Sequence, residues 1–163
     1  MGKVYIFHND VQKGDSGNNI LRGWHNEGES FHGEGGNDEL YGGGGNDDQH
    51  GDEGNDKLVG GNGNDELHGG GGSDTYVFRN GDGNDTIYEI NNDTDTIYFD
   101  QNFQGNTYKC SRDGNNLVID YGAVSSSLIN KITVKNYFTH NTIEYIKFKC
   151  GKTITLSTIE NNE

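Results

Sequence analysis

The sequence predicts an all-β fold in which a parallel β-roll is capped by a C-terminal antiparallel β-rich segment. Units of nine residues, rich in Gly and Asp, repeat without interruption from residue 33 to residue 77. From residue 91 onward the pattern changes to longer strands in which polar and apolar residues alternate. The charge changes over the same region, since residues 1–100 contain 21 Asp and Glu against 5 Lys and Arg, and the rest contain 5 against 7. We therefore expect three regions: an irregular N-terminal segment with degenerate repeats (1–32), the roll (33–88) and the cap (89–163).

The composition argues against a conventional globular enzyme with a large apolar core. Of 163 residues only 29% are hydrophobic, 27 are Gly and none is Pro, and the formal net charge is −14. Low hydrophobicity with high net charge is typical of chains that cannot fold by apolar burial alone. No run approaches the ~20 apolar residues of a membrane-spanning helix, and so acidic a chain is a poor partner for nucleic acid. A folded state therefore needs a stabiliser other than a core.

The repeat unit has Gly at positions one and four, Asp at position six and an apolar residue at position eight, where Gln49 is the exception. Weaker units cover residues 14–22, 80–88 and 90–98. The ten-residue stretch 23–32 breaks the spacing, so the roll could break or end there on its N-terminal side. The regular units are GEGGNDELY (33–41), GGGGNDDQH (42–50), GDEGNDKLV (51–59), GGNGNDELH (60–68) and GGGGSDTYV (69–77).

Each unit predicts a turn followed by a short strand. Gly lets positions one to six adopt positive φ values, so the chain reverses, and positions seven to nine form the strand. Two units make one coil, so strands two units apart stack in parallel, about 4.8 Å from each other. Because side chains alternate along a strand, position eight points inward between two facing sheets. The expected inner columns are Leu40, Leu58 and Tyr76 in one sheet and Phe31, Gln49 and Leu67 in the other.

The position-six carboxylates indicate a metal site. We expect Asp38, Asp56 and Asp74 to stack on one edge of the roll, and Asp47 and Asp65 on the other. Carboxylates this close repel one another unless a cation neutralises them. Carboxylates mixed with the carbonyls of Gly-rich turns form an oxygen-only ligand set that suits Ca²⁺. Mg²⁺ fits less well because it keeps its waters, and Zn²⁺ would want Cys or His, which the turn positions lack.

The segments after residue 91 predict a set of alternating strands. We expect these strands to close the open end of the roll and to supply the hydrophobic nucleus from which the repeats fold. The predicted strands cover residues 94–99, 107–111, 116–121, 131–138, 143–149 and 152–156.

Two further sets of residues have open interpretations. His32, His50 and His68 all occupy position nine and should form a ladder on one outward face. The ladder is either a strip that responds to pH or takes a transition metal, or a solvated face that tolerates any polar residue, which we favour. Cys110 and Cys150 either form a disulfide or remain two free thiols.

The Gly-Gly-x-Gly-x-Asp-x-Leu-x pattern resembles the RTX (repeats-in-toxin) calcium-binding β-roll. Residues 74–89 are similar to its closing repeats, and residues 115–122, 132–138 and 143–155 resemble the flanking segment of haemolysin-like members. The resemblance implies about five to seven Ca²⁺ ions between successive turns, held by position-six carboxylates and turn carbonyls. Asn19 and Asp95 match less well. The implied ligands are Asp38, Asp47, Asp56, Asp65, Asp74 and Asp85, with Gly33, Gly35, Gly42, Gly44, Gly51, Glu53, Gly60, Asn62, Gly69, Gly71 and Asp82.

The resemblance also implies a function. We expect a calcium-binding domain of a secreted, haemolysin-like protein that folds on Ca²⁺ after export by a type I secretion system, with the host cell surface a further partner through the parent protein. No catalytic motif occurs in the chain, so we expect no enzyme activity in it. The alternatives are a calcium-rigidified adhesion or surface-binding module, and an accessory domain of a secreted hydrolase or epimerase.

Overall fold

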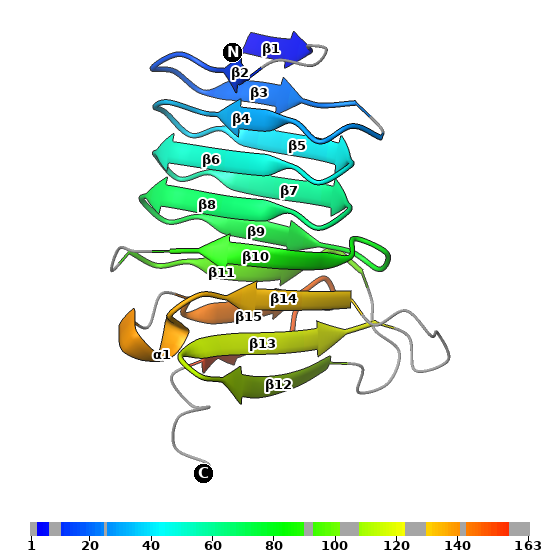
Figure 1. The fold of residues 1–163 in the computed structure, drawn as a ribbon. Helices are drawn as coiled ribbons and strands as arrows, with labels where there is room; N and C mark the ends of the chain where they lie inside the picture. The colour runs from blue at the N-terminus through cyan, green and yellow to red at the C-terminus, as the bar shows by residue number, and fades with distance from the viewer. Residues whose placement is uncertain are drawn as a thin grey trace.

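The structure, a computed structural model, describes residues 3–6, 11–24, 26–89, 93–101, 108–122, 130–140 and 143–156. Its strands form a roll of two facing sheets, and successive strands alternate between them up to β12 (Figure 1). The first sheet has the order β1 (Lys3–Ile6), β3 (Asn19–Arg22), β5 (Glu39–Gly44), β7 (Lys57–Asn62), β9 (Thr75–Phe78), β11 (Thr96–Phe99), β15 (Tyr145–Phe148) and β16 (Thr153–Thr155). The second has the order β12 (Tyr108–Asp113), β13 (Asn116–Tyr121), β14 (Asn130–Val134), β10 (Asn84–Tyr88), β8 (Glu66–Gly71), β6 (Asp48–Glu53), β4 (Ser30–His32) and β2 (Gln12–Lys13).

The register confirms the predicted parallel roll and both inner columns. Leu40 pairs with Leu58, which pairs with Tyr76, and in the other sheet Gln49 pairs with Leu67. In the regular units the strands begin at position seven, as predicted. β5 to β8 also run on into the glycine-rich start of the next unit, so they are longer than expected. The side chains of these two columns, including Gln49, are 0% exposed.

Position four of each unit requires glycine. Gly36, Gly54 and Gly63 have φ values of 106°, 143° and 146°, which side-chain-bearing residues rarely adopt. A Cβ atom on Gly54 would also collide with the carbonyl oxygen of Gly36, one coil earlier. The turns of neighbouring coils therefore lie against each other through bare backbone.

The irregular stretch 23–32 does not break the roll. Leu21, before the stretch, pairs with Leu40, and Phe31, at its end, pairs with Gln49. β1 and β2 extend the same two sheets further toward the N-terminus. The expectation that the roll could end here is therefore wrong, and the coils continue on the N-terminal side of residue 33.

The C-terminal strands are antiparallel, as expected, but they do not form a sheet of their own. β12, β13 and β14 are antiparallel neighbours, as are β15 and β16. β14, however, pairs in parallel with β10, and β15 pairs in parallel with β11. The C-terminal segment therefore continues both sheets of the roll before it folds back (Figure 1).

One predicted strand gives way to a helix in its second half. The segment 131–138 ends its strand at Val134 and turns through Asn136, whose φ is 54°. The helix α1 (Tyr137–His140) follows and buries Tyr137. Alternation of polar and apolar residues predicted a strand through this segment because a single helical turn is too short to show its own period.

Apolar packing is concentrated at the C-terminal end of the roll. The larger core cluster extends from Leu58 to Leu156. Within it, the ring centroid of Phe99 lies 5.0 Å from that of Tyr121 and 5.4 Å from that of Phe148. A smaller cluster near the N-terminus contains, among the described residues, Leu21, Phe31 and Leu40.

Cys110 and Cys150 are both free thiols, with Cys110 partly buried on β12 and Cys150 exposed in the turn after β15. In the part of the chain that the structure describes, no helix is long and apolar enough to cross a membrane.

Candidate metal centre

The position-six aspartates stack in two columns, one on each edge of the roll, as the repeat predicted. Along each column, a backbone N–H donates to Oδ1 of the aspartate one coil further along the chain. On one edge, Asp38 N–H donates to Asp56 at 2.7 Å, and Asp56 N–H donates to Asp74 at 2.8 Å. On the other edge, the same bonds join Asp47 to Asp65 at 2.9 Å and Asp65 to Asp85 at 3.0 Å.

The second carboxylate oxygen, Oδ2, has no hydrogen-bond donor among the residues that the structure describes. In each position-six aspartate this atom is buried, and the residue as a whole is only 1–2% exposed. Burying a carboxylate oxygen with no donor and no counter-charge is costly. The aspartates in this state are Asp38, Asp47, Asp56, Asp65, Asp74 and Asp85.

The position-one glycines complete an oxygen-lined cradle around these atoms. A Cβ atom on Gly51 would lie 2.5 Å from Asp56 Oδ2 and 2.5 Å from the carbonyl oxygen of Gly69, one coil further on. Only glycine leaves this space open, and both atoms that face it are oxygens. Gly33 and Gly42 have the same two kinds of neighbour, and Gly60 and Gly69 face Asp65 Oδ2 and Asp74 Oδ2.

The backbone groups of the position-three residues form hydrogen bonds between neighbouring coils. The carbonyls of Glu53 and Asn62 accept the N–H of the position-four glycine one coil earlier at 2.9 Å, and those of Gly71 and Asp82 do so at 2.7 Å. A carbonyl oxygen has two lone pairs, so each keeps one acceptor site. Asp82 differs from the others because its carboxylate accepts the N–H of Arg79 at 2.5 Å. The other two position-three residues, Gly35 and Gly44, donate their N–H to backbone carbonyls one coil earlier.

Burial raises the pKa of every position-six aspartate, although a backbone hydrogen bond partly opposes it. The pKa rises from 3.8 to about 6 for Asp38 and Asp65, and to about 8 for Asp85. It rises to about 7 for Asp47, Asp56 and Asp74. Among the described residues, the ion pairs of Lys and Arg involve Glu34, Glu39 and Asp100 and none of these aspartates. The columns therefore lack a protein counter-charge over the described ranges.

Sequence reasoning missed Glu29, which takes the aspartate place in the irregular stretch. Its N–H donates to Asp47 Oδ1 at 2.8 Å, the same bond that Asp47 makes to Asp65. A Cβ atom on Gly23 would meet the Glu29 carboxylate and the carbonyl of Gly42. The stretch has one residue more than a regular unit, and the longer side chain of Glu compensates for it. The sequence signal for this assignment was an acidic residue at the seventh place of the stretch, one place after the aspartate position of a regular unit.

Asp95 was expected to match the family pattern less well, but it lies in the same column as Asp74. Asp74 N–H donates to Asp95 Oδ1 at 2.8 Å, and Asp95 Oδ2 is buried with no hydrogen-bond donor in the described part of the chain. Glu144 continues the column, since its Oε2 accepts the N–H of Asp95 at 2.7 Å. Glu89 also reaches this level, where its carboxylate lies within 4.8 Å of ligand atoms of Asp74 and Asp95 and accepts the hydroxyl of Tyr76. The shared Asp-Thr-Ile-Tyr of residues 85–88 and 95–98 was the signal.

The position-five residues form a second ladder that runs the other way. Asn55 N–H donates to Asn37 Oδ1 at 2.9 Å, and Asn64 N–H donates to Asn46 Oδ1 at 2.9 Å, each one coil earlier. Position six therefore ties each turn to the following coil, and position five ties it to the preceding one. The recurrence of Asn before Asp thus has a structural cause that the sequence interpretation did not include.

The comparisons with known proteins agree with this geometry. The family model for the RTX calcium-binding nonapeptide repeat matches in four copies, over residues 26–48 and 50–87. No curated protein matches the chain. The matched residues coincide with the coils whose edges carry the aspartate columns. The repeats of this chain are RTX-type calcium-binding nonapeptide repeats, and they form the parallel β-roll.

Proposed function

We propose that the roll binds Ca²⁺ along both edges and that this binding drives its folding. The observation that supports the proposal is the repeated, buried Oδ2 atom without a donor, which faces a glycine carbonyl across a space that a Cβ would fill. Ca²⁺ prefers carboxylate and carbonyl oxygens in a flexible shell. The residues that would hold it are the position-six aspartates with the position-one carbonyls. Position-three carbonyls, Glu29, Asp95 and Asp82 are further candidates.

The same charges would keep the chain unfolded without Ca²⁺. The strands β4 to β8 each bury a single inward side chain, at position eight, so apolar burial there does little to offset the repulsion between stacked carboxylates. When bound, Ca²⁺ supplies the positive charge that the columns lack. RTX repeats are typical of secreted proteins. We infer that the chain stays extended at the low Ca²⁺ concentration of the cytosol and passes through a type I secretion channel. It then folds outside, where the Ca²⁺ concentration reaches the dissociation constants of extracellular calcium modules, about 10⁻⁴–10⁻³ M.

A calcium titration followed by far-UV circular dichroism tests the folding switch. The metal-free protein should show little β signal, and the signal should rise cooperatively as Ca²⁺ is added. Mg²⁺ at the same concentration should have little effect. A full β signal before any Ca²⁺ is added would contradict the switch.

Asp56→Asn tests the ligand assignment. Asn keeps the oxygen that accepts the N–H of Asp38 but removes the negative charge. We expect the calcium midpoint to rise about tenfold or more and the cooperativity to fall. The matched control is Asp113→Asn at the exposed end of β12, next to the hairpin turn to β13, which should show the same calcium midpoint as the wild type. Equal behaviour of the two variants would show that Asp56 is not a ligand.

A further inference from the structure

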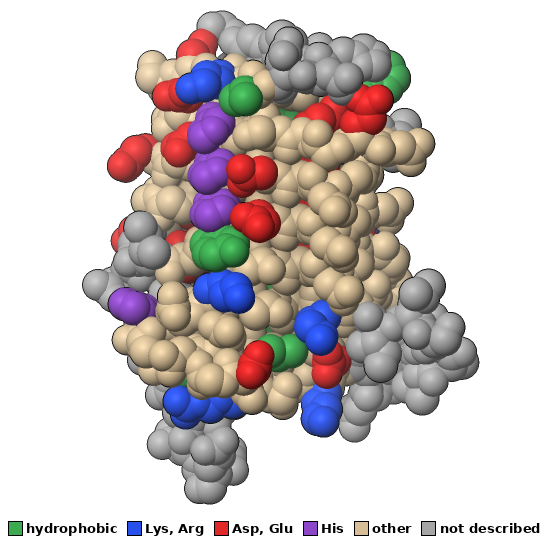
Figure 2. Space-filling model, in the orientation of Figure 1, with side chains coloured by type: hydrophobic (Ala, Val, Ile, Leu, Met, Phe, Trp, Pro, Cys, Tyr) green, Lys and Arg blue, Asp and Glu red, His purple; other side chains and the backbone are tan. Residues whose placement is uncertain are grey.

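Three histidines form a continuous stack on the outer face of the second sheet. The parallel register of β4, β6 and β8 places His32 over His50 and His50 over His68. The ring centroids are 4.6 Å and 4.3 Å apart, and the rings lie within 10° of parallel. Tyr88 extends the stack at 4.5 Å from His68. Figure 2 shows the histidines as a single column on this face, with acidic side chains beside it.

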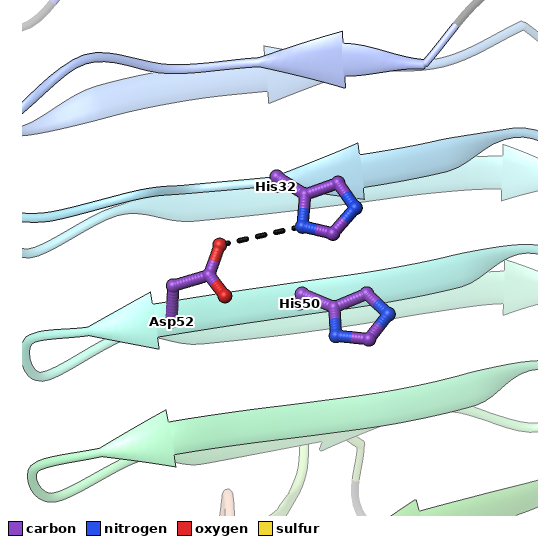
Figure 3. Close-up of side chains that lie close together, drawn as sticks. All are labelled: His32, His50 and Asp52. Atoms are coloured by element: carbon purple, nitrogen blue, oxygen red, sulfur yellow. Dashed lines mark ion pairs between the residues drawn. The ribbon is translucent and has the colours of Figure 1, made fainter.

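Two carboxylates of β6 face the imidazole nitrogens. Asp48 Oδ1 lies 3.0 Å from His50 Nε2 and 3.8 Å from His68 Nε2. Asp52 Oδ2 lies 3.5 Å from His32 Nδ1, and Figure 3 shows its carboxylate directed at His32 from the strand below. Each histidine of the stack therefore has a carboxylate oxygen beside one of its ring nitrogens.

Asp48 Oδ1 is not satisfied by these neighbours. The atom is buried and accepts no hydrogen bond from any described residue, although His50 Nε2 is only 3.0 Å away. A carboxylate held simply by an imidazole N–H would lie along the N–H direction and accept it. Here one oxygen and two imidazole nitrogens converge without bonding one another.

We propose that Asp48, His50 and His68 bind one divalent transition-metal ion, such as Zn²⁺, at a site separate from the calcium columns. Their ligand atoms lie within 4.8 Å of one another. Two imidazole nitrogens and a carboxylate, with water in the fourth position, are a ligand set typical of Zn²⁺, whereas Ca²⁺ takes oxygen ligands only. Burial lowers the pKa of His68, and the neighbouring His50 acts in the same direction, which favours the neutral imidazole that a metal requires.

The geometry also limits the number of ions. His32, His50 and Asp52 form a second group of the same kind, but the two groups share His50, so we expect one ion per ladder. Stacked rings must rotate for two Nε2 atoms to reach one ion. The side chains of His50 and His68 are 28% and 30% exposed, so they have room to do so.

A zinc titration with saturating Ca²⁺ present tests the proposal, because the calcium sites are then filled and the roll is folded. Isothermal calorimetry should show one Zn²⁺ per chain, and the ring resonances of His50 and His68 should shift in NMR spectra. His50→Asn and Asp48→Asn should each weaken zinc binding about tenfold or more. His140→Asn is the matched control, since His140 is an exposed histidine on α1, away from the stack.

Each outcome decides the question. Circular dichroism in Ca²⁺ first shows that each variant is folded, and Asp48→Asn serves if His50→Asn is not. Saturable zinc binding that both ladder variants retain, or that Ca²⁺ displaces, would overturn the proposal, as would an absence of binding. The test is independent of the calcium switch, because a roll that folds without Ca²⁺ would contradict the switch and still give the same zinc result.

Discussion

Glu34 and Asp52 occupy the second position of their units, where the neighbouring units have glycine. Their φ values are 73° and 71°, and the glycines at the same position, Gly43, Gly61 and Gly70, have φ values of 101–103°. A side-chain-bearing residue in this region loses about 1–2 kcal/mol relative to the right-handed conformation. The repeat thus keeps its shape at these positions at some cost in backbone strain.

Glu34→Gly should therefore stabilise the calcium-loaded roll. Glycine removes the backbone strain, but its greater freedom in the unfolded chain lowers stability by about 0.5–1 kcal/mol. The substitution also removes an exposed ion pair with Lys13, which contributes little to stability. We expect the free energy of unfolding to rise by about 0.5–1 kcal/mol. Urea unfolding in saturating Ca²⁺ measures it. Gly43→Ala, the reverse change at the same position, should destabilise, and a loss of stability in both variants would disprove the argument.

Gln49 interrupts an otherwise apolar column. It is 0% exposed and lies between Phe31 and Leu67. Its Nε2 donates to the carbonyl of Val59 at 3.1 Å, but its Oε1 is buried and no described residue donates to it. An unsatisfied buried oxygen costs about 1–3 kcal/mol.

Gln49→Leu should join the two apolar clusters that this residue separates. We expect a rise of about 1 kcal/mol in the free energy of unfolding, because the buried oxygen is removed and only one hydrogen bond is lost. Gln49→Met, which keeps the length of the side chain, should behave similarly. Thermal unfolding in saturating Ca²⁺ measures both, and a lower melting temperature in both would show that the bond to Val59 outweighs the unsatisfied oxygen.

At the scale of elements, the roll and its closing strands share one core. β14 and β15 join the roll as parallel neighbours of β10 and β11, so the C-terminal aromatic residues pack directly against the last coils. The N-terminal coils have only a small cluster of their own. This difference predicts that folding starts at the C-terminal end and proceeds toward the N-terminus.

A matched pair of cavity variants tests this direction. Leu117→Ala removes a buried side chain on β13, and Leu21→Ala removes one on β3. Each deletion costs about 2–5 kcal/mol locally. Leu117→Ala should raise the calcium midpoint of the whole transition, whereas Leu21→Ala should leave the midpoint nearly unchanged and reduce only the final signal. Equal shifts of the midpoint would mean that folding has no preferred end.

The regular repeat made the inner columns and the aspartate columns predictable, because a fixed period sets which residues share a face. Glu29 and Asp95 fall where the period changes by one residue or more, so spacing alone could not place them. The pairing of β14 with β10 was not predictable either. Alternation shows which face of a strand is buried, but it does not show which strand lies beside it.

For the whole molecule, the net charge of −14 is concentrated in the half of the chain that contains the columns. The buried aspartates take up protons more readily than free ones, because burial raises their pKa from 3.8 to about 6–8. Protons and Ca²⁺ therefore compete for the same carboxylates. The stability of the roll should therefore depend on pH in opposite directions with and without Ca²⁺.

Without Ca²⁺, the folded roll should be more stable in acid than at neutral pH. Between pH 3.8 and about 8 the folded state binds more protons than the unfolded state, so stability falls as pH rises through this interval and is level above it. With Ca²⁺ the slope reverses, because Ca²⁺ binds the ionised carboxylates, and the calcium midpoint should fall as pH rises from 6 to 8. Circular dichroism of protein freed of metal on a chelating resin, and calcium titrations at several pH values, measure both slopes. A midpoint independent of pH would mean that the buried carboxylates are not the calcium ligands.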